Sequence, residues 1–232
     1  MKIQMLVMAT FAFGLAACSG GETKSDEMAS DANKAVNRPA TPPSGSATPA
    51  ATLAQGPDVC FKAIAKQIGA DTKVAEIASF FSSGPEVDPS DDEPTGQMTT
   101  CTVQYQSPDD PRKLVGIQMD MKTGTFSEPA PIEIRVMGDA ASFRLDDHIV
   151  PLSQVQAGAL TAIMNAKKAD LDKVFSKYAW TGVRLMGPDS FRDKHTLRLD
   201  VEGRIAANDI KESGYASISL DGQKIVTDNL AP

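Results

Sequence analysis

The 232-residue sequence predicts an α+β fold with N-terminal helices, an antiparallel sheet, a central helix pair and a C-terminal β-hairpin, all after a disordered tether. Three observations predict it. Segments with helical and strand-like periodicity follow in the order helices, strands, helices, strands, which favours an antiparallel sheet over a βαβ repeat. Asp221-Gly222 lies between two strand-like runs and is a strong hairpin signal. The stretch before residue 57 has no aromatic residue after the first twenty positions, so it cannot bury enough apolar surface to fold.

An apolar run opens the chain. Lys2 precedes residues 3–17, which have few polar interruptions and end in small residues. About fifteen residues are too few to span the ~30 Å hydrocarbon core of a bilayer as a helix. The pattern is typical of a secretory signal peptide, and we expect residues 1–17 to be removed from the mature protein.

The run ends in Leu15-Ala16-Ala17-Cys18, followed by Ser19. This pattern resembles the lipobox of bacterial lipoproteins. The resemblance implies that the Cys18 thiol receives a diacylglycerol and that Cys18 becomes an acylated N-terminus. Two or more acyl chains anchor a protein stably, so membrane lipid would hold the protein on the bacterial cell envelope. Ser19 indicates, by the same resemblance, the outer membrane, with the folded part facing the periplasm; an ordinary signal peptide that contains a cysteine is the alternative.

The chain divides into three parts on this interpretation. Residues 1–17 are the lipoprotein signal peptide, residues 18–56 are the acylated N-terminus and a disordered tether, and residues 57–232 are a single α+β globular domain. Whether the two groups of strands form one sheet or two small lobes stays open.

Two helices are expected at the start of the globular part. Asp58 suits the N-cap of the first, which carries Cys60, Ile64 and Ile68 and ends at Gly69. The second, over residues 71–81, places four apolar residues on one side: Val74, Ile77, Ala78 and Phe81.

Residues 82–97 are predicted to be an acidic loop, because their prolines and glycines forbid regular structure. Its carboxylates are Glu86, Asp88, Asp91, Asp92 and Glu93. Clustered carboxylates could bind Ca²⁺, but the EF-hand order is missing, and a solvated loop is the preferred interpretation. Such a loop is a reasonable contact for a cationic partner.

Strands follow the loop. Alternating apolar and polar residues predict strands over residues 100–106, 113–121, 132–137 and 142–146, with Gly138-Asp139 as a turn. Helical spacing then predicts a helix pair over residues 151–165 and 170–180. The last third returns to strands, over residues 182–186, 196–201, 216–220 and 223–227.

With Cys18 assigned to lipid, Cys60 and Cys101 remain as a pair. The cell envelope is oxidising, so a disulfide is the expected state. A bridge over roughly forty residues contributes about 4 kcal/mol in the chain-entropy model. Two free thiols are the alternative; a redox or metal pair is disfavoured because there is no CxxC and only two histidines, His148 and His195.

Nothing in the sequence points to an enzyme. The sequence contains no G-x-S-x-G, S-x-x-K or H-E-x-x-H pattern and no glycine-rich phosphate loop. His148 and His195 are interpreted as polar loop or surface residues, although a dispersed Ser-His-Asp site needs no sequence proximity. We therefore expect no catalytic residue, no metal site and no cofactor. The net charge of −7 argues against nucleic acid as a partner.

These observations favour a membrane-anchored lipoprotein whose folded part binds an envelope protein, as an inhibitor or immunity-like module. An accessory or scaffold lipoprotein of an envelope complex is the alternative, and an enzyme with a dispersed site is the third possibility. The expected partner contacts are the five acids of residues 82–97 together with Trp180, whose ring is either an exposed anchor or part of the edge of the core.

Overall fold

The computed structural model describes residues 4–5, 51–137, 139–189 and 193–232. Except for Gln4–Met5, the predicted signal segment lies outside the described residues. So do Cys18, residues 18–50 of the predicted tether, and Gly138 of the predicted turn.

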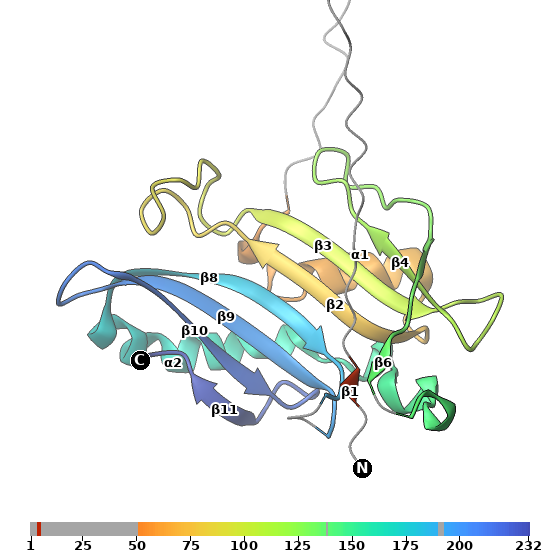
Figure 1. Ribbon diagram of the computed structural model, residues 1–232. Helices are drawn as coiled ribbons and strands as arrows, with labels where there is room; N and C mark the ends of the chain where they lie inside the picture. The colour runs from red at the N-terminus through yellow and green to blue at the C-terminus, as the bar shows by residue number, and fades with distance from the viewer. Residues whose placement is uncertain (1–3, 6–50, 138, 190–192) are drawn as a thin grey trace, which may run out of the picture.

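A nine-stranded antiparallel sheet forms the centre of the molecule (Figure 1), in the order β11-β10-β9-β8-β2-β3-β4-β5, with β7 paired to β2. Its strands are β2 (Lys73–Phe81), β3 (Met98–Gln106), β4 (Leu114–Gln118), β5 (Ala130–Ile132), β7 (Val150–Pro151), β8 (Phe175–Met186), β9 (Thr196–Ile205), β10 (Lys211–Ile218) and β11 (Ile225–Asn229). Two residues of β1 (Gln4–Met5) pair separately with β6 (Val136–Met137). The α-helices of the described chain are α1 (Val59–Ile68) and α2 (Leu160–Val174).

The sheet consists of two halves with the same order of elements. In the first half, α1 is followed by β2, β3, β4 and β5, each paired with the next; in the second, α2 is followed by β8, β9, β10 and β11. The first strands of the two halves, β2 and β8, pair antiparallel at the centre, with Ile77 opposite Leu185 and Phe80 opposite Gly182. One continuous sheet therefore joins both halves.

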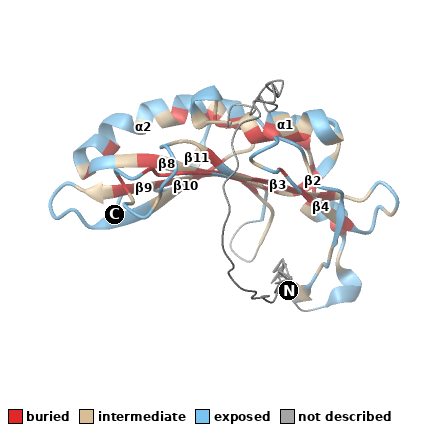
Figure 2. Cartoon of the chain, turned by 90° about the horizontal axis from the view of Figure 1, so that it is seen from above, coloured by how far each residue is buried: buried red, intermediate tan, exposed pale blue. Residues whose placement is uncertain are grey.

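Both α-helices lie on the same face of the sheet (Figure 2). Their buried residues, including Ile64 of α1 and Leu171 of α2, belong to the main hydrophobic core together with Ile77, Val183 and Leu199 of the strands. An antiparallel sheet can bury one face and leave the other in solvent. The face without α-helices is called the open face below.

The fold class predicted from the sequence is wrong. The described chain is mostly antiparallel sheet, and its residues 51–137 and 139–189 contain neither the expected pair of N-terminal helices nor the central helix pair. The second predicted helix, over residues 71–81, is the central strand β2. Val74, Ile77 and Phe81 fit a helical spacing, but Ile77, Ser79 and Phe81 also alternate, and β-branched and aromatic residues pack well in a sheet.

The predicted central helix pair is one helix followed by a strand. Residues 152–154 and 157–159 form short 3-10 helices, and α2 begins only at Leu160. The segment expected to be the second helix contributes its first residues to α2 and the rest to β8, which begins at Phe175. Strand β8 pairs with β9 on one side and β2 on the other, and this non-local pairing outweighs the local helical spacing.

The outcome differs among the other predicted strands. The strand expected over residues 142–146 is replaced by 3-10 helices over Ala140–Ser142 and Leu145–His148. The strands around residues 100–106 and 196–201 exist as β3 and β9. The C-terminal hairpin also exists, as β10 and β11, and Gly222 in its turn has a φ of 70°.

Candidate functional site

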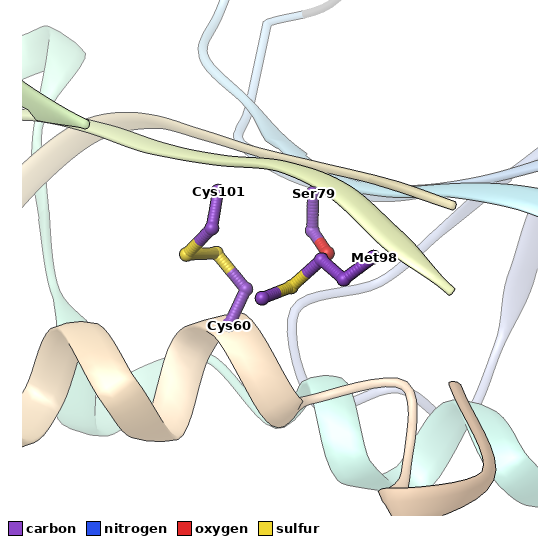
Figure 3. The surroundings of a disulfide bond; sticks show 4 residues. All are labelled: Cys60, Ser79, Met98 and Cys101. Carbon is purple, nitrogen blue, oxygen red and sulfur yellow. A yellow bond between two sulfur atoms is a disulfide. The ribbon is translucent and has the colours of Figure 1, made fainter. Parts of the chain in front are cut away.

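Cys60 and Cys101 form a disulfide, as the sequence predicts. Their Cα atoms are 5.6 Å apart, and both residues are fully buried. The bridge joins α1 to β3 beside Ser79 and Met98 (Figure 3). It lies in the core beneath α1, so its role is structural.

The acidic loop of residues 82–97 is attached to the second half of the sheet. Lys177 Nζ lies 2.6 Å from Glu86 Oε2, and Lys211 Nζ lies 2.6 Å from Asp88 Oδ2. Between them, Val87 is buried and its carbonyl accepts a hydrogen bond of 2.7 Å from Arg204 Nε. The ammonium groups hold the pKa values of Glu86 and Asp88 below their ordinary values. Two of the five predicted partner contacts are therefore ion-paired within their own chain.

Asp91 holds the start of this loop. Its Oδ2 accepts hydrogen bonds from Ser82 Oγ at 2.9 Å, Ser83 N at 3.0 Å and Gly84 N at 3.3 Å. Desolvation raises the pKa of Asp91, but the hydrogen bonds outweigh it and leave the pKa below its ordinary value. Asp92 and Glu93 are the two acids of the loop that remain exposed without a cation, and Glu93 accepts a hydrogen bond from Gln97 Nε2.

Trp180 lies in β8, not at the end of a helix. It is half-buried, packs against the main core and meets Tyr178 edge to face, with ring centroids 6.5 Å apart. These contacts match the core-edge interpretation of its ring.

The two histidines lie close together, although 47 residues separate them. His195 Nε2 donates a hydrogen bond of 3.1 Å to the carbonyl of His148, and the His148 ring stacks on Phe143. Burial lowers the pKa of both rings. Neither histidine is among the residues that line three hollows of the described surface.

The described residues contain no group of three or more His, Cys, Asp or Glu side chains placed to hold a metal ion. They also contain no helix that is both long and apolar enough to cross a membrane.

Charged and polar side chains gather on the open face, where the strand register aligns them in rows. One row runs through Phe80 of β2, Gly182 of β8, Asp200 of β9 and Tyr215 of β10, each opposite the next. The neighbouring row contains Ala78, Arg184, Arg198 and Ser217 in the same strands. Residues directly opposite one another in a sheet share a face, so these side chains meet.

Asp200 joins the two arginines. Arg184 donates through Nε and one terminal nitrogen to the two oxygens of Asp200, both at 3.0 Å, and Arg198 Nε donates at 2.7 Å. Gly182 makes room for this cluster, because a Cβ at that position would lie 2.5 Å from Asp200 Oδ2. Each arginine also lies on an aromatic ring. The Arg198 guanidinium carbon is 3.8 Å from the Tyr215 centroid, and that of Arg184 is 5.4 Å from the Phe80 centroid.

This cluster forms one side of a hollow of about 580 Å³, which we call the arginine hollow. The acidic loop forms another side through Ser83, Asp88 and Asp91. Lys211, between Asp88 and Glu202, lies at its margin. Asp200 pairs with both arginines, Lys211 pairs with Asp88 and Glu202, and Asp91 is held by hydrogen bonds from Ser82 and Ser83.

A second hollow of about 810 Å³ lies on the open face of the first half, and we call it the glutamate hollow. Its floor is a row of register partners, Glu76 of β2, Gln104 of β3 and Gly116 of β4. Ile132 and Glu133, in and just after β5, form part of its wall. The charges in this hollow differ from those of the arginine hollow, since its ionisable lining residues are all acids.

Two polar groups on that floor lack partners. The carboxylate of Glu76 accepts no hydrogen bond from the described chain, and Oε1 of Gln104 is buried without one. Burial raises the pKa of Glu76, while the charge of Arg184 opposes that rise. Buried acceptors normally have donors, so Gln104 Oε1, with the unbonded Glu76 carboxylate beside it, is a site where a donor from outside the chain would fit.

The sequence prediction missed both hollows. A usable signal was present in β9, where Arg198, Asp200 and Glu202 alternate with Leu197, Leu199 and Val201. That alternation indicates a strand with one apolar and one charged face. No local signal connects Glu76 with Gln104, because the pairing of β2 and β3 brings them together.

No protein-family model, curated protein or solved structure shows significant similarity to this chain.

Proposed function

We propose that this protein is a lipid-anchored binding protein of the bacterial envelope, and that it binds a partner protein through the open face of its sheet. The anchor rests on the lipobox-like sequence ending in Cys18. The binding role rests on the open face itself.

The observation that carries the binding proposal is the pair of hollows side by side on the open face. Pockets of a few hundred Å³ with a few convergent polar groups are typical binding sites. Phe80 is 36 % exposed beneath Arg184, and aromatic and arginine side chains are enriched at protein interfaces. The protein's net charge of −7 favours a basic partner.

The binding proposal is tested by photocrosslinking in living cells. A crosslinking amino acid replaces Gln118 or Ser213, which are exposed and line the glutamate and arginine hollows. Matched controls carry it at the exposed Lys66 of α1 and Lys168 of α2, on the opposite face. We expect both open-face positions to crosslink to one envelope protein that the helix-face positions do not reach. Equal crosslinking from both faces would contradict the proposal.

The anchor is tested separately with Cys18→Ala. This change is expected to abolish labelling with a fatty-acid probe and to release the protein from the membrane fraction. The matched control is Cys60→Ala with Cys101→Ala, which removes the two disulfide-bonded cysteines of the described core and should leave labelling intact. Persistent labelling of the Cys18 variant would rule out the lipoprotein interpretation.

A further inference from the structure

We infer that the glutamate hollow binds a lysine or arginine side chain presented by a segment of the partner protein, with Glu76 and Gln104 accepting hydrogen bonds from its cationic end. This inference rests on the proposed function and names the chemistry of one contact within it.

The floor of the hollow supplies hydrogen-bond acceptors that have no donors among the described residues. Glu76 has no hydrogen-bond donor in the described chain, and Gln104 Oε1 is a buried atom with none. The two residues are opposite one another in β2 and β3, so their side chains emerge next to each other on the same face. Two adjacent acceptors without donors are matched by an ammonium or guanidinium group, which has donors only.

The charge of the glutamate hollow also favours a cationic ligand. The ionisable groups that line the hollow are Glu76, Asp120 and Glu133. Asp120 is occupied by the backbone amides of a turn, and Glu133 is paired on the exposed surface with Arg135. Arg184 is the nearby cation whose charge lowers the pKa of Glu76, but its guanidinium directs its two hydrogen bonds to Asp200 and none to Glu76. The carboxylate of Glu76 is thus the negative charge available to a ligand.

The shape of the hollow suits a long side chain. Gly116 has no side chain in the row of the floor, and the side chain of Ile132 leans towards it, since a Cβ on Gly116 would lie 3.0 Å from Ile132 Cδ1. Pro131 and Met121 add further apolar lining. An apolar wall beside paired acceptors suits the aliphatic stem of a long cationic side chain.

A metal ion fits less well. Ca²⁺ takes six to eight oxygen ligands, whereas the floor offers one free carboxylate and one amide oxygen. The described residues also contain no three-carboxylate group of the kind such an ion needs. An organic cation is therefore the occupant that the hollow favours.

The test is a binding measurement on the full chain, purified in a neutral detergent. The probes are fluorescently labelled acetyl-Gly-Gly-Lys-Gly-Gly-amide and two peptides in which norleucine or glutamate replaces the lysine. Fluorescence anisotropy is expected to detect binding of the lysine peptide, with the norleucine peptide at least about tenfold weaker, because a hydrogen bond to a charged group is lost. Equal binding of the lysine and norleucine peptides would overturn the inference.

Variants locate the binding. Glu76→Gln and Gln104→Leu are each expected to weaken the binding of the lysine peptide about tenfold and to leave the binding of the norleucine peptide unchanged. Glu212→Gln is the matched control, because Glu212 is an exposed β10 carboxylate that lines neither hollow. Thermal unfolding of each variant excludes a folding defect. Unchanged lysine affinity in both hollow variants would also overturn the inference, as would competition by CaCl₂ that sodium chloride at equal ionic strength does not reproduce.

The two proposals can fail separately. If crosslinking from Ser213 and Gln118 captures a partner but the lysine peptide does not bind, the open face remains the binding surface and only the cation contact is refuted. If the lysine peptide binds but no partner crosslinks to the open face, the inference that the glutamate hollow binds a cation is supported and the proposed protein-binding function is refuted.

Discussion

Arg184 and Asp200 lie side by side on β8 and β9 and form two parallel hydrogen bonds, both 3.0 Å long, on the open face of the sheet. Arg198 adds a third at 2.7 Å, so one carboxylate holds two guanidinium groups. The exposed fractions of the three side chains are 21 % for Arg184, 26 % for Arg198 and 15 % for Asp200. Solvent therefore screens this cluster less than it screens an exposed ion pair.

Asp200→Asn should destabilise the protein more than the loss of an exposed ion pair. The change leaves two partly buried arginines without their anion, and we expect the free energy of unfolding to fall by about 2 to 3 kcal/mol. Urea unfolding measures this. Asp146→Asn is the matched control, because Asp146 and Lys73 are 71 % and 44 % exposed, and an exposed pair is worth less than about 1 kcal/mol. Equal effects of the two changes would show that the cluster contributes no more than a surface pair.

Removing the disulfide should lower the free energy of unfolding by more than either of these changes. Cys60 and Cys101 are 41 residues apart in sequence, and the chain-entropy model assigns such a bridge about 4 kcal/mol. The double variant Cys60→Ser, Cys101→Ser is expected to unfold at much lower urea concentration. Reducing agent should shift the unfolding midpoint of the wild type to that of the variant and leave the variant unchanged. If full reduction left the unfolding midpoint of the wild type unchanged, the structural role of the bridge would be contradicted.

Asp91→Asn should loosen the acidic loop without unfolding the sheet. The change weakens the hydrogen bonds to the amides of Ser83 and Gly84. Hydrogen exchange of these amides is expected to accelerate about five- to tenfold, in line with the loss of about 1 kcal/mol. Asp92→Asn is the control, since Asp92 is exposed in the same loop. Acceleration across the β2 and β3 amides as well would indicate a global effect.

The stability of the protein should depend on pH through Glu76. Burial raises its pKa above the ordinary value of 4.5, so the folded protein keeps this proton to higher pH than the unfolded chain does. At lower pH both states are protonated and the group contributes nothing. As pH rises past 4.5 towards the raised pKa, the free energy of unfolding falls, and the deficit persists at neutral pH.

Glu76→Gln removes this deficit. We expect the variant to match the wild type in acid and to be more stable at neutral pH, which urea unfolding at a series of pH values measures. A variant that is less stable at neutral pH would mean that the carboxylate is stabilised within the free protein. A gain in stability with a loss of cation binding is the trade-off expected of a binding residue.

The accuracy of the sequence prediction followed the local character of each element. The first helix, around Cys60 and Ile64, was predicted correctly because its helical spacing and Gly69 at its end agree, although Asp58 at the N-cap makes no capping hydrogen bond. The hairpin was predicted correctly because Asp221-Gly222 sets a local turn. Strand β9 was predicted over residues 196–201, although the alternation that gives it a charged face was not recognised as part of a site.

The errors arose where two periods fit the same residues. Val74, Ile77 and Phe81 satisfy a helical stripe as well as a strand, and the residues around Phe175 do the same. In both segments the strand is stabilised by partners far away in sequence: β2 pairs with β3 and β8, and β8 also pairs with β9. Strand preference depends on such neighbours, so the segment alone does not determine it.

The sequence by itself determined the Cys60–Cys101 disulfide, the first helix and the C-terminal hairpin, because each depends on residue chemistry or on neighbours along the chain. The lipid anchor at Cys18 and the envelope location remain predictions from the same source. Only the tertiary structure decided that two similar halves share one sheet, and that this sheet places Arg184 on Asp200 and Glu76 beside Gln104. Register between distant strands made those contacts, and register depends on the pairing of the whole sheet and not on any single segment.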